Sequence, residues 1–275
     1  MMHSLPTWLI IAHTLVKTTA QEVGKFVHEA GDYRITYDVD DAQKVTFTFY
    51  VPPTPGMWSS DRSVYNLGLP SEHIRYGPYP LSWVDDFTYA IDSTEANPSF
   101  RTWYKSIERL LLRNRVIQPD HHFPAAGMQF GDLTTLTFKN GDALSTNFRG
   151  ERLIFERVAQ SLTPGHFVYK EVASPYLEIN YMTHADETME FWAGCGDDRT
   201  TRYTVKLSRR DNDRLYVYYA AGPTQSGSLD PLFQAVGRVC PSKYFDATGP
   251  FEAVFVSEET IYASFGGSRI ALTKA

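Results

Sequence analysis

The sequence predicts a mostly-β protein, an antiparallel meander that closes as a barrel or folds as a sandwich, with one main amphipathic helix packed outside. Three observations predict it. Runs of alternating apolar and polar residues recur along the chain. Turn residues separate these runs, and aromatic residues, which favour strands, make up 14% of the chain. A single strongly amphipathic segment near residue 100 predicts the helix.

The first two strands are predicted at 33–39 and 45–51, where alternation places the apolar residues on one face. The turn Asp40-Asp41-Ala42 joins them as a hairpin. From residue 52 to residue 83 the alternation stops, and prolines and glycines are interleaved with aromatic residues. Long irregular segments in compact domains are often binding loops. We therefore expect either a lid over a binding site or an aromatic wrap over one end of the sheet.

The helix is predicted to begin after Asn97, a good N-cap, with Pro98 in its first turn. Its apolar residues fall on one face and its charged residues on the other. Asn140-Gly141, a strong hairpin signal, lies between two alternating runs. Further strands are expected at 166–172, 176–182, 188–192, 202–207, 214–219, 251–256, 260–265 and 269–273, with a short helix at 230–236. No internal repeat or dividing linker is visible, so residues 21–275 are predicted to form a single β-rich domain.

Residues 1–20 are predicted to be a signal peptide, which makes the mature protein secreted. The apolar run 5–16 is too short to span a bilayer, and the small residues Thr18 and Ala20 precede Gln21. The alternative is an N-terminal helix capped by Ser4, because no Lys or Arg precedes the run. Cys195 and Cys240 then predict one disulfide in an exported chain, or two free thiols in a cytosolic one.

Several classes of protein are disfavoured. The net charge of −6 and the scattered Lys and Arg residues argue against a nucleic-acid partner. No apolar run is long enough for stable membrane insertion. The phosphate-binding loop, the dinucleotide fingerprint, the His-Glu-x-x-His helix and the nucleophile elbow are all absent, so we expect no cofactor. The oligomeric state is left open.

Asp120-His121-His122 is the one cluster with metal-ligand chemistry. Adjacent residues of an extended chain point to opposite sides, so both imidazoles would reach one ion only through a special turn. We therefore expect an exposed polar loop there and no metal site.

Glu178 and Glu190 are the candidate catalytic residues. They lie on consecutive predicted strands, and a turn centred on His184 would place them opposite each other. Two facing carboxylates split their pKa values, as acid–base and glycosidase chemistry require. Tyr176 and Trp192 would flank them as ligand-binding residues. The alternative is that this face meets solvent and the carboxylates only aid solubility.

Tyr216 and Tyr218 lie on the predicted strand 214–219, where one alternating set would point into a barrel and line a ligand cavity. Trp58 and Trp83, from the irregular segment, would close that cavity. The alternative is an aromatic core that fills the barrel completely.

The fold is calycin-like by analogy only, and a fold analogy does not establish function. The leading hypothesis is a secreted β-barrel protein that binds a small apolar or aromatic molecule, and a cofactor-free isomerase or cyclase is one form of it. The alternatives are a secreted carbohydrate-active hydrolase that uses the two glutamates and a protein-binding surface module. A filled core with exposed tryptophans would favour the last of these. Whether the protein is an enzyme is therefore left open.

Overall fold

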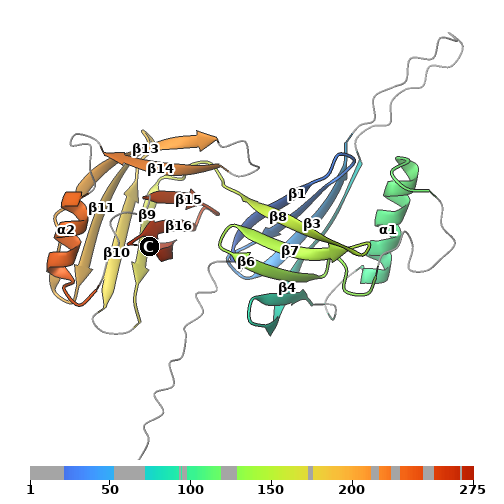
Figure 1. Ribbon diagram of the computed structural model, residues 1–275, viewed down its shortest axis with the longest axis horizontal. Helices are drawn as coiled ribbons and strands as arrows, with labels where there is room; N and C mark the ends of the chain where they lie inside the picture. Colours follow the sequence, from blue (N-terminus) through green and yellow to red (C-terminus); the bar gives the residue numbers. More distant parts are fainter. Residues whose placement is uncertain are drawn as a thin grey trace, which may run out of the picture.

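The structure is a computed structural model and confirms the mostly-β class, with antiparallel strands, a closed barrel and an outer amphipathic helix (Figure 1). It describes residues 22–52, 72–92, 94, 98–118, 129–172, 176–211, 217–223, 230–243, 251–266 and 268–275. Residues 1–21, Trp58, Tyr216 and Asp120-His121-His122 therefore lie outside the described residues. Among the described helices, none is long and apolar enough to cross a membrane.

The first half of the chain forms a closed antiparallel barrel. Each strand pairs with the next, and β1 pairs with β8 as well as with β2, which closes the ring. The strands are β1 (Gly24–Glu29), β2 (Arg34–Val39), β3 (Lys44–Val51), β4 (Glu72–Asp85), β5 (Thr88–Ile91), β6 (Thr135–Asn140), β7 (Ala143–Phe148) and β8 (Glu151–Val158).

The second half forms a sheet of nine strands that closes in the same way. The strands are β9 (Gly165–Lys170), β10 (Leu177–Thr183), β11 (Thr188–Cys195), β12 (Asp198–Arg199), β13 (Tyr203–Asp211), β14 (Val217–Pro223), β15 (Glu252–Phe255), β16 (Thr260–Phe265) and β17 (Ser268–Lys274). Because β10 pairs with both β9 and β11, all of these strands except β12 form a ring, and β12 branches from β11.

The two rings have the same chain path. In each, five ring strands are followed by a helix and then by three strands: α1 (Phe100–Arg113) follows β5, and α2 (Asp230–Val239) follows β14. Both helices lie on the outer sides of the molecule, away from the opposite ring (Figure 1). The sequence shows no internal repeat, and what the two rings share is their strand order and register.

The equivalent strands also match in sequence once their register is known. The first strands read GKFVHE in β1 and GHFVYK in β9. The second strands read RITYDV in β2 and EINYMT at the corresponding positions of β10. The shared Phe, Ile and Tyr residues all point into the cores. These few inward positions are what the two rings have in common, so no continuous similarity is visible in the linear sequence.

Each ring has its own hydrophobic core. In the first barrel, the buried rings of Phe26, Tyr37, Phe47 and Phe155 pack with the apolar face of α1. In the second, Phe167, Tyr181, Phe191 and others form a separate cluster that includes residues of α2. The strands are thus divided between two sheets. That residues 21–275 form one domain stays a prediction.

A small third cluster joins the two barrels. Val23, Val254, Val256 and Tyr262 are buried there. Arg157 at the end of β8 is fully buried among them and donates hydrogen bonds to the carbonyls of Gly141 and Val23. Its guanidinium lies 4.3 Å from the ring centroid of Phe26 and 4.7 Å from that of Tyr262. One cation therefore bridges a ring of the first barrel and a ring of the second.

Polar contacts support the same junction. The Asp41 carboxylate accepts hydrogen bonds from Ser257 (3.2 Å) and Thr260 (2.7 Å). The backbone N–H of Gln160 donates a hydrogen bond to the carbonyl of Phe255 at 2.7 Å. Burial lowers the pKa of Arg157 to about 10, which shows that the surroundings disfavour its charge. The carbonyl acceptors and aromatic rings offset that penalty.

The segment 52–83, which was predicted to be irregular, is in part a strand, and its residues 53–71 lie outside the described residues. Residues from Glu72 onward form β4, whose pairing with β3 shifts register between Val45 and Phe47. Gly77 and Pro78 lie in this bulge, where proline removes no ladder hydrogen bond. The prolines hid the alternation, so the sequence pattern indicated a loop. Strands β1, β5 and β8 were also not predicted from the pattern.

The predicted disulfide is present. Cys195 at the end of β11 and Cys240 directly after α2 are bonded, with their Cα atoms 5.5 Å apart. Cys240 is fully buried, so the bond joins α2 to the wall of the second barrel rather than joining two surface turns. The main helix begins at Phe100 with Ser99 as its N-cap, two residues later than predicted.

Candidate functional site

The two predicted catalytic carboxylates do not face each other. Glu178 pairs with Gly194 and Glu190 pairs with Met182, because the turn between β10 and β11 is centred on Asp186 rather than His184. Glu190 is four residues from Gly194, about 13 Å along the strand. An even offset keeps both glutamates on the outer face of the second barrel. The expected cross-strand pairing of these carboxylates is therefore wrong, although their shared face is right.

Glu178 is surrounded by groups that stabilise its charge. It accepts a hydrogen bond from the Asn180 amide (3.0 Å), and Lys170 and Arg199 lie 3.3 and 3.7 Å from its oxygens. The Asn180 hydrogen bond, helped by Lys170, holds the pKa of Glu178 below its usual range. A general acid needs a raised pKa, so this environment disfavours that role for Glu178.

Trp192 lies on the same outer wall, yet only 9% of it is exposed. The His166 ring stacks on it at 5.3 Å and 22°, and the Arg202 guanidinium lies 4.5 Å from its centroid. Arg202 also pairs with Glu190 at 2.9 Å, and His166 Nε2 lies 2.9 Å from Asn180 Oδ1. The second barrel thus covers its own tryptophan with stacked polar side chains.

The other predicted ligand-binding aromatics do not gather into one site among the described residues. Tyr176 precedes β10 and is 57% exposed, and Trp83 near the end of β4 is 61% exposed. Tyr218 lies in β14 opposite Arg210, but its side chain is outside the described set, as are Trp58 and Tyr216. The neighbouring Tyr219 is the inward residue, buried with its ring centroid 5.4 Å from that of Phe255.

The described interiors are occupied by aromatic rings in mutual contact. In the first barrel, Phe47 lies 5.0 Å from Trp103 and Tyr37 lies 5.0 Å from Phe155, centroid to centroid. In the second, Tyr181 and Phe191 are 5.5 Å apart. Such spacings are those of packed aromatic pairs. They favour the filled-core alternative over a cavity inside the barrels.

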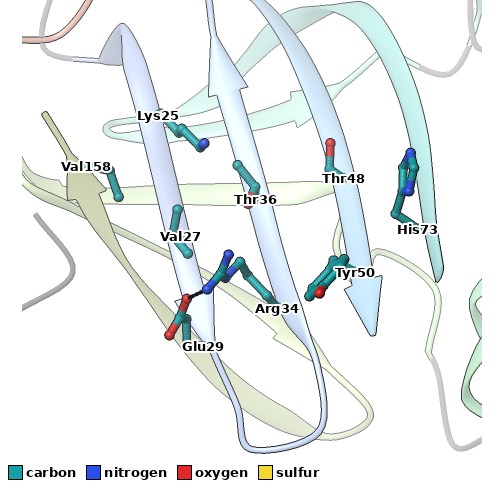
Figure 2. A pocket seen from close by; sticks show the side chains of 9 residues that line it. All are labelled: Lys25, Val27, Glu29, Arg34, Thr36, Thr48, Tyr50, His73 and Val158. Atoms are coloured by element: carbon teal, nitrogen blue, oxygen red, sulfur yellow. Dashed lines mark ion pairs between the residues drawn. The ribbon is translucent and has the colours of Figure 1, made fainter. Parts of the chain in front are cut away.

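A hollow of about 400 Å³ lies instead on the outer wall of the first barrel, over β1, β2, β3 and the start of β4. Its floor is a row of small side chains, Val27, Thr36 and Thr48, which pair across three adjacent strands. Longer side chains border this row, with Lys25 on one side and Arg34 and Tyr50 on the other (Figure 2). We call this hollow the outer trough. It exists because these three short side chains lie side by side, with longer side chains next to them.

The border of the outer trough carries two cations and one carboxylate. Lys25 and Arg34 line it together with the His73 imidazole, and the carboxylate, Glu29, pairs with Arg34. Arg75, opposite Thr48, is also exposed nearby.

Among the described residues, Lys25 and Arg75 have no ion-pair partner, although Asp38 pairs with Lys25 in the backbone register. The two threonine hydroxyls and the Tyr50 hydroxyl add hydrogen-bonding groups.

The sequence pattern did not single out these residues, because each lies at an ordinary outward position of a strand. Their common feature is visible only once three strands are in register. The described residues contain no group of three or more His, Cys, Asp or Glu side chains placed to hold a metal ion.

No protein-family model matches the sequence, and no curated protein matches it significantly.

Proposed function

We propose that this chain is an exported binding protein that holds a small anionic molecule in the outer trough of its first barrel. One observation carries the proposal: the row Val27, Thr36 and Thr48 leaves a hollow bordered by the cations Lys25 and Arg34. A volume of about 400 Å³ is that of a small-ligand site.

The charges of the trough support an anionic ligand. Arg34 is held in place by its contact with Glu29, and its guanidinium lies 5.9 Å from the Tyr50 ring centroid. A positioned guanidinium loses little freedom when it binds a carboxylate, sulfonate or phosphate. Lys25 adds a second positive charge on the other side of the floor. The Thr36 and Thr48 hydroxyls, which lie between the two charged side chains, would donate hydrogen bonds to the bound anion.

Export is the second part of the proposal, and the Cys195–Cys240 disulfide supports it. Mass spectrometry of the intact protein from its natural source tests it. The mass expected is that of a chain beginning at Gln21 with two hydrogens fewer than the reduced form. A full-length, reduced chain would contradict this part of the proposal.

Binding is tested by protein NMR titration with methanesulfonate and benzenesulfonate as probes. The double variant Lys25→Ala/Arg34→Ala is expected to lose about tenfold in affinity for both, because two charge-assisted contacts are removed. Lys105→Ala/Lys139→Ala removes the same charge at exposed positions outside the trough and is the matched control. Equal affinities in the two double variants would contradict the proposal.

A protein-binding module is the second candidate, favoured by an exposed apolar tip. Trp83, Val84 and Phe87, at the β4–β5 hairpin, are 61%, 49% and 57% exposed, in an otherwise filled fold. A photo-crosslinking residue at position 83 is expected to capture one defined partner protein, and the same residue at the exposed position 105 on α1 none. Equal crosslinking at both positions would contradict this candidate. Hydrolase and isomerase activities stay predictions.

A further inference from the structure

The two barrels share one wall design, which allows the first to be compared with the second position by position. Val27 pairs with Thr36, and Thr36 with Thr48, in the first barrel. The corresponding row of the second barrel is Val168, Asn180 and Trp192, with the same pairings. Trp192 therefore occupies the place that Thr48 holds in the outer trough.

The neighbours of this position correspond as well. Lys25 precedes Val27 by two positions and therefore lies on the same face of β1, and His166 precedes Val168 in the same way on β9. Arg75 precedes Tyr76, which pairs with Phe47, just as Arg202 precedes Tyr203, which pairs with Phe191. The first barrel thus has a cation at each of the two positions from which the second barrel covers its indole.

In the second barrel this arrangement holds a planar ring almost entirely away from water. The His166 ring stacks on the Trp192 indole, and the Arg202 guanidinium lies over it at 4.5 Å. Cation–π and stacking contacts of this kind need a flat π system between the covering groups. Both barrels have side chains at the two covering positions on their outer walls. Only the second barrel has an aromatic ring, that of Trp192, between them.

We propose that the outer trough takes an aromatic anion, whose ring lies where Trp192 lies in the second barrel and whose charge meets Lys25 and Arg34. This deepens the binding function proposed above and rests on it. The ring lies over the row Val27, Thr36 and Thr48, between Lys25 and Arg75. An aryl carboxylate, sulfonate or phosphate of small size fits the volume and the charges.

Three sulfonates that differ only in the group attached to the sulfonate test the role of the ring. Methanesulfonate has a methyl group, cyclohexanesulfonate a saturated ring and benzenesulfonate an aromatic ring. We expect benzenesulfonate to bind about fivefold more tightly than cyclohexanesulfonate, since the two are similar in size but only one has a π face. In NMR spectra of the unaltered protein, the methyl signals of Val27, Thr36 and Thr48 should show ring-current shifts with benzenesulfonate only.

Thr48→Trp restores the missing ring from within the chain. It is expected to fill the trough and abolish benzenesulfonate binding, whereas Thr273→Trp, the same change at an exposed wall position of the second barrel, leaves binding unchanged. Persistent binding in Thr48→Trp, or an equal loss in both variants, would overturn the inference. The methyl shifts decide the matter if Thr48→Trp does not fold.

The outcomes separate the two proposals. If all three sulfonates bind equally and depend on Lys25 and Arg34, the ring inference fails while the anion-binding function stands. If none of them binds, the proposed function itself fails.

Discussion

The two barrels differ in how they use the same wall. In the first, Thr48 leaves the outer trough open, and cationic side chains border it. In the second, Trp192 fills the equivalent position, and its neighbours form a closed set of ion pairs and stacked rings. One position in a shared strand register thus decides whether a barrel wall has a hollow or a buried aromatic ring.

The helices of the two barrels differ in a parallel way. Helix α1 is anchored by Trp103, whose ring is stacked between Phe47 at 5.0 Å and Tyr76 at 4.9 Å. Helix α2 is anchored by the Cys195–Cys240 bond and by Phe233, stacked on Phe265. Helix α1 is held on the first barrel by non-covalent contacts alone, while the second barrel adds a covalent bond. This difference makes the stabilities of the barrels separately testable.

The largest expected effect is loss of the disulfide. Cys195→Ala/Cys240→Ala should lower the free energy of unfolding by roughly 4 kcal/mol, since the bond closes a long loop. Hydrogen exchange should report the loss in the second barrel, with protection of β1–β3 unchanged. An equal loss of protection in both barrels would show that they unfold as one unit and would remove the distinction between them.

Arg157 tests whether the barrels are coupled through their junction. Arg157→Met leaves the carbonyls of Gly141 and Val23 without this donor and is expected to cost about 3 kcal/mol of unfolding free energy. Arg152→Met, on the same strand but exposed, is the control. Denaturant unfolding followed by signals from both barrels is the measurement. A loss confined to one barrel would mean that the junction contributes little.

Trp192→Thr converts the second wall to the composition of the first. We expect a loss of about 2 kcal/mol of unfolding free energy, because the buried indole and its contacts with His166 and Arg202 are lost. Added indole should raise the melting temperature of this variant and not that of the unaltered protein. Failure of indole to restore stability would contradict the view that this wall position holds a flat ring.

The smallest effect concerns Glu178 and pH. Its folded-state pKa lies below the ordinary value of 4.5, so its contribution to stability is present above pH 4.5 and is lost as the pH falls through the lowered value. Glu178→Gln should therefore be less stable than the unaltered protein at pH 7, by less than about 1 kcal/mol. The two melting curves should converge in acid. A gap that widens in acid would contradict this sign.

Local patterns predicted much of the fold. Alternation located β2 and β3, Asn140-Gly141 located the β6–β7 hairpin, and the amphipathic run located α1. The prediction failed at β4, where Gly77 and Pro78 interrupt the alternation at a bulge. It also failed for the Glu178–Glu190 pairing, since the turn is centred two residues later than predicted, which moves the partner of Glu178 by four positions. Period-two patterns set the face of a residue but not its partner across the sheet.

The linear order of residues was enough to predict the mostly-β class, many of the strands, the main helix and which two cysteines could bond, because each depends on local spacing or on only two candidates. The shared strand order of the two rings, the junction around Arg157 and the outer trough were decided by tertiary structure alone. They depend on which residues of different strands stand side by side, and that is set by closure of each ring and by packing of its core. Thr48 and Trp192 look unrelated in the chain and become equivalent only in space.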